Sequence, residues 1–204
     1  NRGEIACRIL RTLKASGVAS VAIHHAVEAR SPHVTQADEA VEIFGDTPVA
    51  AHLDAEQIIA AAHKTGADAI HPGYGFLSEN ARFAAAVEAA GLTFIGPSAE
   101  TIALMGDKIS ARDFARAQGA PVAPSVTPTG DLDAFLDRAE AIGFPLLIKA
   151  AAGGGGKGMS IVRSSSDLKQ AARIAASEAQ RYFGDGRIYA ETYVERPRHI
   201  EVQI

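Results

Sequence analysis

The feature that most limits how this chain can fold is a repeated alternation of helical and β-rich segments in its first hundred residues. Four-residue apolar spacing predicts a first helix, cap residues a second and an alanine-rich run a third. Each is followed by a short β-rich run: 4–16 and 18–24, 55–64 and 67–71, and 79–90 and 92–95. Strands that alternate with helices of this length are typical of parallel βαβ units, with helices on both faces of the sheet. The first half of the chain is therefore predicted to be an α/β unit with a parallel sheet.

Local signals mark where these helices begin and end. Asp54 is suited to cap the second helix, and Gly17, Gly66 and Gly91 follow the three helices, as glycine commonly does at a helix carboxyl end. A further strand just upstream of Asn1 would complete the alternation. Because the chain starts without methionine and ends in a strand-like run at 200–204, we expect it to be a piece of a longer protein.

The second half has a different organisation. Pro121, Pro124, Pro128 and Gly130 fall within ten residues and predict a semi-stiff connector rather than an element. A smaller α+β unit is expected beyond it. Its predicted elements are a helix at 131–142, a strand at 145–150, a glycine-rich turn at 153–158, a strand at 159–163, a helix capped by Ser166 and ending near 182, and a strand at 188–193.

Composition narrows the functional class. Apolar residues make up 47% of the chain and the formal net charge is −4, which fits a globular protein without the basic surface that nucleic acids or anionic membranes select. A single cysteine, Cys7, allows no internal disulfide, and no apolar run is long enough to span a bilayer. We expect a cytoplasmic-type enzyme or binding domain with no nucleic-acid or membrane partner. His24, His25 and His33 lack zinc-ligand spacing.

The strongest chemical signal is the run Gly153-Gly154-Gly155-Gly156-Lys157-Gly158. So many glycines predict main-chain N–H groups brought close to an anion. A dinucleotide-binding turn would be followed by a helix, but a β-rich run, 159–163, follows here. A P-loop would have Ser or Thr after Lys157. With these two nucleotide-binding loops excluded, the run is interpreted as a hairpin that covers nucleotide phosphates. The alternative is a flexible hairpin tip that binds nothing.

Lys149 strengthens the phosphate interpretation, because it lies in the apolar strand 145–150, where a lysine is costly unless its ammonium meets an anion. Other candidates are weaker on their own. Lys108 opens a helix, and His199 and Glu201 share one face of the last run. The loop 71–80 follows a parallel strand, where α/β sheets place ligands, although a simple turn explains it equally well. Glu191 and Glu195 could be surface acids.

Several segments together resemble one family, the biotin carboxylase component of biotin-dependent carboxylases, which belongs to the ATP-grasp superfamily. The resemblance runs from end to end of the chain. The segments that carry it are 1–8, 37–40, 71–80, 94–97, 105–108, 148–150, 153–159 and 197–201, the first reading NRGEIACR and the last PRHIE.

The resemblance implies a fold and its domains. Residues 1–105 would form a Rossmann-like domain, the part that precedes the ATP-grasp fold. A connecting helix and Pro-rich linker would occupy 106–130, and the small ATP-grasp flap subdomain 131–193. Residues 194–204 would begin the larger carboxyl-terminal subdomain, the rest of which lies after Ile204.

The resemblance also implies an ATP site. Lys108 and Lys149 match lysines that hold nucleotide phosphates, and Met159 would lie against adenine. His199 matches a contact on the ribose or phosphate side, with Glu201 nearby. The flap that closes over the phosphates matches Gly153, Gly154, Gly155 and Gly156, and the hinge that reads the adenine edge matches Glu191, Thr192, Tyr193 and Val194.

In the family, ATP and bicarbonate form carboxyphosphate, whose CO2 is transferred to N1′ of biotin. The implied cofactor is Mg²⁺, with Mn²⁺ possible, and biotin is the carrier-bound substrate. Implied partners are a biotin carboxyl carrier, a carboxyltransferase and a second copy of the chain. The parent would be an acyl-CoA carboxylase such as acetyl-CoA or propionyl-CoA carboxylase, as in fatty acid biosynthesis, in the cytoplasm or the mitochondrial matrix.

The sequence departs from the family pattern at some positions. Thr192 stands where relatives often have lysine, and Lys157 where many have arginine. The stretch 24–27 is less acidic than usual and is expected to affect a surface loop. The metal-binding glutamates, the base for bicarbonate and the arginine for biotin are expected after Ile204, so the 204 residues alone are predicted to be inactive and to hold no catalytic or metal-binding residue.

Two other functions compete with this ligase hypothesis. A carbamoyl-phosphate-synthase-like or other carboxylate–amine ligase would share the glycine hairpin and its lysine, but we would not expect the 71–80 and 198–201 motifs in it. A nucleotide-binding regulatory module would keep the phosphate contacts without the chemistry. The chain beyond Ile204 distinguishes these possibilities.

Overall fold

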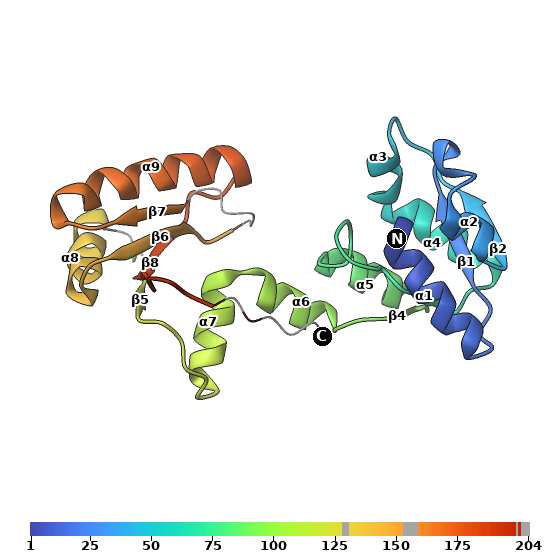
Figure 1. Cartoon of the computed structure of the whole chain (residues 1–204), viewed down its shortest axis with the longest axis horizontal. Coiled ribbons are helices and arrows are strands. Elements are labelled where there is room, and N and C mark those ends of the chain that lie inside the picture. The colour runs from blue at the N-terminus through green and yellow to red at the C-terminus, as the bar shows by residue number, and fades with distance from the viewer. Residues whose placement is uncertain (128–130, 153–158, 199, 201–204) are drawn as a thin grey trace. The chain divides into compact units, whose positions relative to one another are not determined.

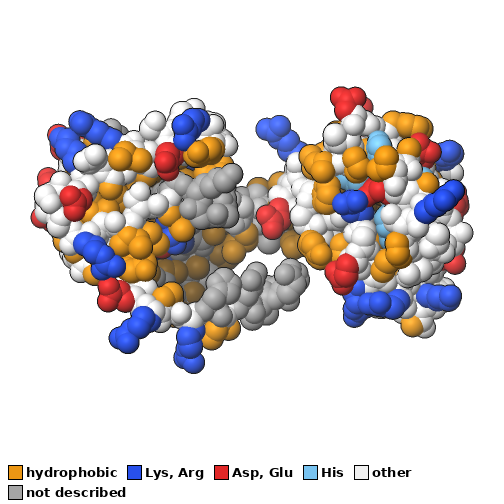
Figure 2. Space-filling model, turned by 45° about the horizontal axis from the view of Figure 1, so that its top comes forward, with side chains coloured by type: hydrophobic (Ala, Val, Ile, Leu, Met, Phe, Trp, Pro, Cys, Tyr) orange, Lys and Arg blue, Asp and Glu red, His pale blue; other side chains and the backbone are white. Residues whose placement is uncertain are grey.

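The structure is a computed structural model that describes residues 1–127, 131–152, 159–198 and 200. The chain divides into two units, Asn1–Leu104 and Met105–Ile204, and each is described by itself. The finer boundaries at residues 130 and 193 stay predictions. On the face shown in Figure 2, basic and acidic side chains are interspersed over both units. Among the described residues, no helix combines the length and the apolar character needed to cross a bilayer.

The first unit alternates helices and short strands (Figure 1). Strands β1 and β2 pair in parallel, and so do β3 and β4, which confirms the predicted parallel arrangement. In the described residues they form two separate pairs rather than one continuous sheet. The elements are α1 Gly3–Ala15, β1 Val21–His24, the 3-10 turn η1 Ala26–Glu28, α2 Pro32–Gln36, β2 Glu39–Glu42, α3 Pro48–His52, α4 Ala55–Thr65, β3 Ala69–Ile70, α5 Ala81–Ala89, β4 Thr93–Phe94 and α6 Ala99–Gly106.

Capping explains where these helices start. The Asp54 carboxylate accepts a hydrogen bond from the Gln57 N–H at 3.0 Å, as predicted, and Gly66 ends α4 in the left-handed conformation with φ 69°. The predicted start of α5 at residue 79 was wrong, because the Asn80 side chain accepts from the Phe83 N–H at 3.0 Å and fixes the first turn after it. All three predicted strands are shorter than expected, since their flanking residues lack a strand partner in the described chain.

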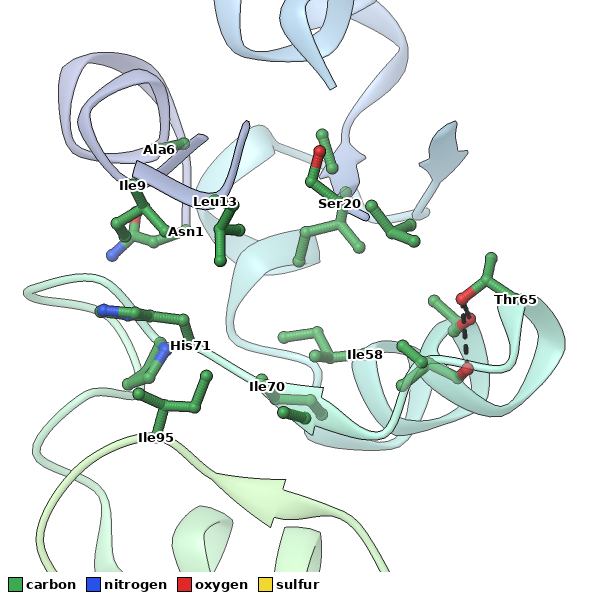
Figure 3. Close-up of a pocket in the computed structure, with 18 of the residues that line it drawn as sticks. Asn1, Ala6, Ile9, Leu13, Ser20, Ile58, Thr65, Ile70, His71 and Ile95 are labelled. Atoms are coloured by element: carbon green, nitrogen blue, oxygen red, sulfur yellow. Dashed lines mark hydrogen bonds between the residues drawn. The ribbon is translucent and has the colours of Figure 1, made fainter. Parts of the chain in front are cut away.

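A cavity of about 600 Å³ lies inside this unit, bordered by residues of β1 and β3 as well as by helices. In Figure 3, Ile9 and Leu13 of α1 face Ile70 of β3, and Ile58 of α4 lies beside them. Each of β1 and β3 pairs along one edge only within the described residues. The cavity thus has a strand edge on each of two sides and apolar helix faces around it. A further parallel strand has this environment in an α/β sheet.

We therefore expect an apolar strand joined to the amino side of Asn1 to fill this cavity and to stabilise the unit. Five alternating Val and Ile residues should raise the melting temperature by more than about 4 °C, since about 1 kcal/mol shifts a domain of this size by that amount. Calorimetry of the extended and original chains measures the shift. A polar extension of equal length is the control, and an equal effect of both extensions would contradict this prediction.

Buried polar side chains cluster beside the start of α1. Glu28 is only 3% exposed, and its carboxylate pairs with Arg2 and accepts from the His52 Nε2 at 3.1 Å. Burial disfavours ionisation of Glu28, but the hydrogen bonds from the His25 N–H, His52 and Arg2 outweigh it and hold its pKa below the usual value. Burial lowers the pKa of both His33 and His52.

These histidines make the stability of the first unit depend on pH. Because these pKa values are lowered in the folded state, the unfolded chain binds protons before the folded chain as the pH falls. The free energy of unfolding therefore has its full value above about pH 6.5 and decreases as the pH drops below it. We expect thermal unfolding between pH 7.5 and 5 to show this loss. His52→Gln, which keeps a donor for Glu28, should flatten the profile, whereas the exposed His63→Gln should leave it unchanged. Identical profiles for all three proteins would be the contrary result.

The second unit is an antiparallel sheet with two helices on one face. Its strand order is β5-β8-β6-β7, and Figure 1 shows α9 running along β6 and β7. The predicted helices and strands are confirmed, with small changes at their ends. The elements are α7 Lys108–Ala117, β5 Ser125–Val126, α8 Leu132–Ile142, β6 Leu146–Ala150, β7 Met159–Val162, α9 Ser165–Phe183 and β8 Ile188–Thr192.

Two local predictions in this unit were wrong. The proline-rich connector contains a strand, because Ser125 and Val126 pair with Glu191 and Ala190 of β8. Ser164, not Ser166, precedes the first turn of α9, and its hydroxyl bonds to the Ser166 hydroxyl and the Asp167 carboxylate, both at 2.8 Å.

The core of the second unit lies between the sheet and helices α8 and α9. Alternate residues of β6, Leu146, Ile148 and Ala150, are buried there. Side chains at the intervening positions of a strand point to the opposite face. The helices therefore cover one face of the sheet, and Leu147 and Lys149 belong to the other face.

Candidate functional site

The face of the β6–β8 sheet opposite α8 and α9 carries the predicted site residues. Lys149 lies opposite Met159 of β7 on one side and Tyr189 of β8 on the other. Leu147, two residues earlier on β6, lies opposite Glu191. Because residues directly opposite each other in antiparallel strands share a face, Lys149, Met159 and Glu191 are brought together on this face. Met159 is about half exposed there.

Lys149 is paired with a carboxylate on this face. Its Nζ lies 2.5 Å from the Glu191 Oε1, and the two side chains are 25% and 12% exposed. A close ion pair offsets the cost of partly burying both charges. The anion that the sequence requires for Lys149 is therefore Glu191 in this structure, and a phosphate contact of Lys149 stays a prediction.

Sequence reasoning missed a second cation at this place, Arg112 of α7. Its guanidinium donates to the Glu191 Oε2 through Nη1 and to the Ala123 carbonyl through Nη2 at 2.6 Å. The guanidinium carbon also lies 5.2 Å from the centre of the Tyr189 ring, within cation–π range. Burial, together with the nearby Glu191 charge, raises the pKa of Tyr189.

The first turn of α7 is also anchored to this sheet. Asp107 caps the helix by accepting from the Ile109 and Ser110 N–H groups, and its other oxygen accepts from the Arg187 Nη2 at 2.9 Å. The Ser110 N–H, followed by Arg187, holds the Asp107 pKa below its usual value against the effect of burial. The Arg187 carbonyl accepts from the Ala151 N–H at 2.8 Å. Arg187 thus links the start of α7, where Lys108 is half-buried, to the residues just before the glycine run.

The remaining predicted hinge residues are less closely associated. Tyr193 follows β8 and donates its N–H to the Pro145 carbonyl at 3.0 Å. Thr192 alternates with Glu191 and so belongs to the helix-covered side of the sheet, and its N–H donates to the Pro124 carbonyl. Val194 is exposed. Six predicted residues lie outside the described residues: Gly153, Gly154, Gly155, Gly156, His199 and Glu201.

The loop 71–80 belongs to the first unit. The Gly73 N–H donates to the His71 Nδ1 at 3.0 Å, and Gly73 and Gly75 both have positive φ. Throughout the described residues, no three His, Cys, Asp or Glu side chains form a group that could hold a metal ion. What the described residues do assemble is one carboxylate between two cations on the sheet face opposite α8 and α9, with the start of α7 fixed beside it. This arrangement carries net positive charge and suits an anionic ligand.

Comparison with known proteins agrees with this organisation. Residues 1–102 match the family described as "Biotin carboxylase, N-terminal domain", and residues 107–204 match "Carbamoyl-phosphate synthase L chain, ATP binding domain". The chain is 49% identical over its whole length to the biotin carboxylase of Haemophilus influenzae, 46% of which it covers. It is 45% identical to the mitochondrial propionyl-CoA carboxylase alpha chain of Caenorhabditis elegans and covers 28% of that protein.

Solved structures give the same result. A biotin carboxylase complex with β-γ-ATP from Campylobacter jejuni matches 97% of this chain and 45% of that one, with a TM-score of 0.89 and 41% identity. The biotin carboxylase domain dimer of Hydrogenobacter thermophilus 2-oxoglutarate carboxylase, in complex with MgADP, ADP and bicarbonate, matches 96% of this chain and 43% of that one, with a TM-score of 0.86 and 43% identity.

These matches define a chain of mixed α/β fold whose second half is similar to an ATP-binding domain. The chain belongs to the biotin carboxylase family. It spans about half the length of the biotin carboxylases that it matches.

Proposed function

We propose that the protein to which these residues belong is a biotin carboxylase, an ATP-dependent ligase. ATP phosphorylates bicarbonate to carboxyphosphate and releases ADP. Carboxyphosphate then yields phosphate and CO2, and N1′ of biotin loses a proton as it bonds to that carbon. The observation that carries the proposal is the sheet face opposite α8 and α9, where Lys149, Glu191 and Arg112 meet, in a chain that resembles nucleotide-bound biotin carboxylases over almost its full length.

Within this reaction, the described residues would bind and orient the nucleotide. Lys108 and Lys149 would hold phosphate oxygens, since a lysine ammonium forms strong charge-assisted hydrogen bonds to phosphate. Adenine would lie against Met159, with its edge at Glu191, Thr192, Tyr193 and Val194. We propose that the glycines at 153–156 close over the phosphates and that His199 and Glu201 contact the nucleotide. For these six residues, the sequence alone supports the proposal.

The protein ligands of the metal and the biotin that accepts CO2 would lie outside the described residues. Mg²⁺ or Mn²⁺ would neutralise phosphate charge when bound, with glutamates after Ile204 as its protein ligands. The proposed partners are a biotin carboxyl carrier, a carboxyltransferase and a second copy of the chain in the full-length protein. We propose a cytoplasmic setting, in an acyl-CoA carboxylase and in fatty acid biosynthesis.

An assay of the full-length protein, with bicarbonate or biotin omitted in turn, tests this proposal. ADP formation should require both bicarbonate and biotin, and labelled bicarbonate should enter an acid-labile carboxybiotin. Turnover that instead requires an amine would support a carboxylate–amine ligase. Nucleotide binding without turnover in any mixture would support a regulatory module. Either of these two results would overturn the proposed reaction.

A further inference from the structure

The function proposed above gives Arg112 no contact with the nucleotide, yet three contacts hold it at the proposed site. Its two terminal nitrogens donate to different acceptors, the Glu191 carboxylate and the Ala123 carbonyl. Its guanidinium also lies over the Tyr189 ring. The side chain is 16% exposed, which is low for an arginine on a helix surface. Contacts to the backbone and to the ring fix its position without any help from Lys149.

Glu191 is shared between two cations. Its Oε1 lies 2.5 Å from the Lys149 Nζ, and its Oε2 accepts from the Arg112 Nη1. Two positive groups around one carboxylate leave a net charge of one positive unit. A carboxylate that is already paired with a fixed guanidinium attracts the lysine less strongly, because the arginine offsets its negative charge at short range. The Lys149 ammonium is then still able to attract a phosphate.

We propose that Arg112 is a positioning residue for ATP binding, which holds Glu191 so that Lys149 is available to the nucleotide phosphates. The inference rests on the proposed function, because it takes Lys149 to be a phosphate ligand. Without Arg112, the Glu191 carboxylate would pair with Lys149 alone. A phosphate would then have to displace a complete ion pair.

The chain offers a matched control on the same helix. Arg116 lies one turn after Arg112, but its side chain is 50% exposed and pairs with Asp113 at 3.0 Å. It also contacts the Ser125 hydroxyl at 3.3 Å, and within the described residues no hydrogen bond or ion pair joins it to Glu191 or Lys149. Replacing either arginine with methionine removes one charge from α7, but only Arg112→Met removes the partner of Glu191.

The experiment measures the Kd of ATP and of adenosine for the full-length protein by calorimetry. We expect Arg112→Met to weaken ATP binding about tenfold and adenosine binding less than twofold, because only ATP has phosphates. Arg116→Met should change neither affinity by more than twofold. Arg112→Lys, which keeps a cation beside Glu191, should restore ATP binding to within about threefold of the wild type, and it serves as the second variant if Arg112→Met does not fold.

A double-mutant cycle separates positioning from a general structural effect. In a Glu191→Gln background there is no carboxylate to capture Lys149, so Arg112→Met should weaken ATP binding less than threefold. A tenfold loss in both backgrounds, equal losses for ATP and adenosine, or no loss for Arg112→Met would each overturn the inference and leave the proposed function standing. If the wild-type protein binds no ATP, the proposed function fails and the inference fails with it.

Discussion

Replacing Lys149 with glutamine is expected to weaken ATP binding to the full-length protein by more than about 1.5 kcal/mol, or roughly tenfold in Kd. The change keeps the length and polarity of the side chain but removes the ammonium charge. A charge-assisted hydrogen bond to phosphate is lost, and Glu191 loses one of its two cationic partners. Titration with ATP measures the loss. An unchanged Kd would show that Lys149 serves only the ion pair with Glu191.

Lys169→Gln provides the control for this variant. Lys169 lies on α9 and pairs with Asp133 at 2.8 Å, and both side chains are more than half exposed. Exposed pairs of this kind contribute little to stability, and α9 packs against the opposite face of the sheet. We therefore expect Lys169→Gln to bind ATP as the wild type does.

Phe135→Ala is expected to destabilise the second unit by about 3–5 kcal/mol, the usual cost of removing a buried phenyl ring. Phe135 of α8 is fully buried and belongs to the core formed with β6, β8 and α9. This loss is a large part of the stability of an ordinary domain. Hydrogen exchange at β6 and β8 during urea titration reports the opening of this unit alone.

The matched variant is Phe114→Ala on α7. Phe114 is 46% exposed, so its replacement should cost less than about 1 kcal/mol. Equal losses for both variants would contradict the assignment of the core to the helix-covered face. That assignment matters for function, because the same strand alternation puts Lys149 and Glu191 on the opposite face.

Prediction from sequence succeeded where the signal is local. Asp54 and Gly66 mark the ends of α4 through their own hydrogen bonds and backbone conformation, so the sequence is sufficient there. The strand at Ser125 and Val126 was missed because it exists only through its pairing with β8, more than sixty residues away. The Pro-rich composition of that stretch favoured a connector, and tertiary pairing outweighed that tendency.

In the candidate site, too, local signals were predictable from sequence and tertiary contacts were not. Lys149 could be singled out from sequence because a lysine within an apolar strand requires a partner. Only the family resemblance singled out Glu191; its spacing alone could not distinguish it from a surface acid, since the register between β6 and β8 places it beside Leu147 and next to Lys149. Arg112 is one of several arginines in the chain, and no local pattern separates it from Arg116 on the same helix. Its role depends on contacts with Glu191 and Ala123 that only the folded chain creates.

The central claim is that the face of the β6–β8 sheet opposite α8 and α9 holds the phosphates of a nucleotide. A crystal structure of the full-length protein with MgATP, or with an analogue that resists hydrolysis, tests it most directly. We predict density for a triphosphate with the Lys108 and Lys149 ammonium groups on its oxygens and adenine against Met159. Nucleotide bound elsewhere, with Lys149 still paired only to Glu191, would contradict the claim.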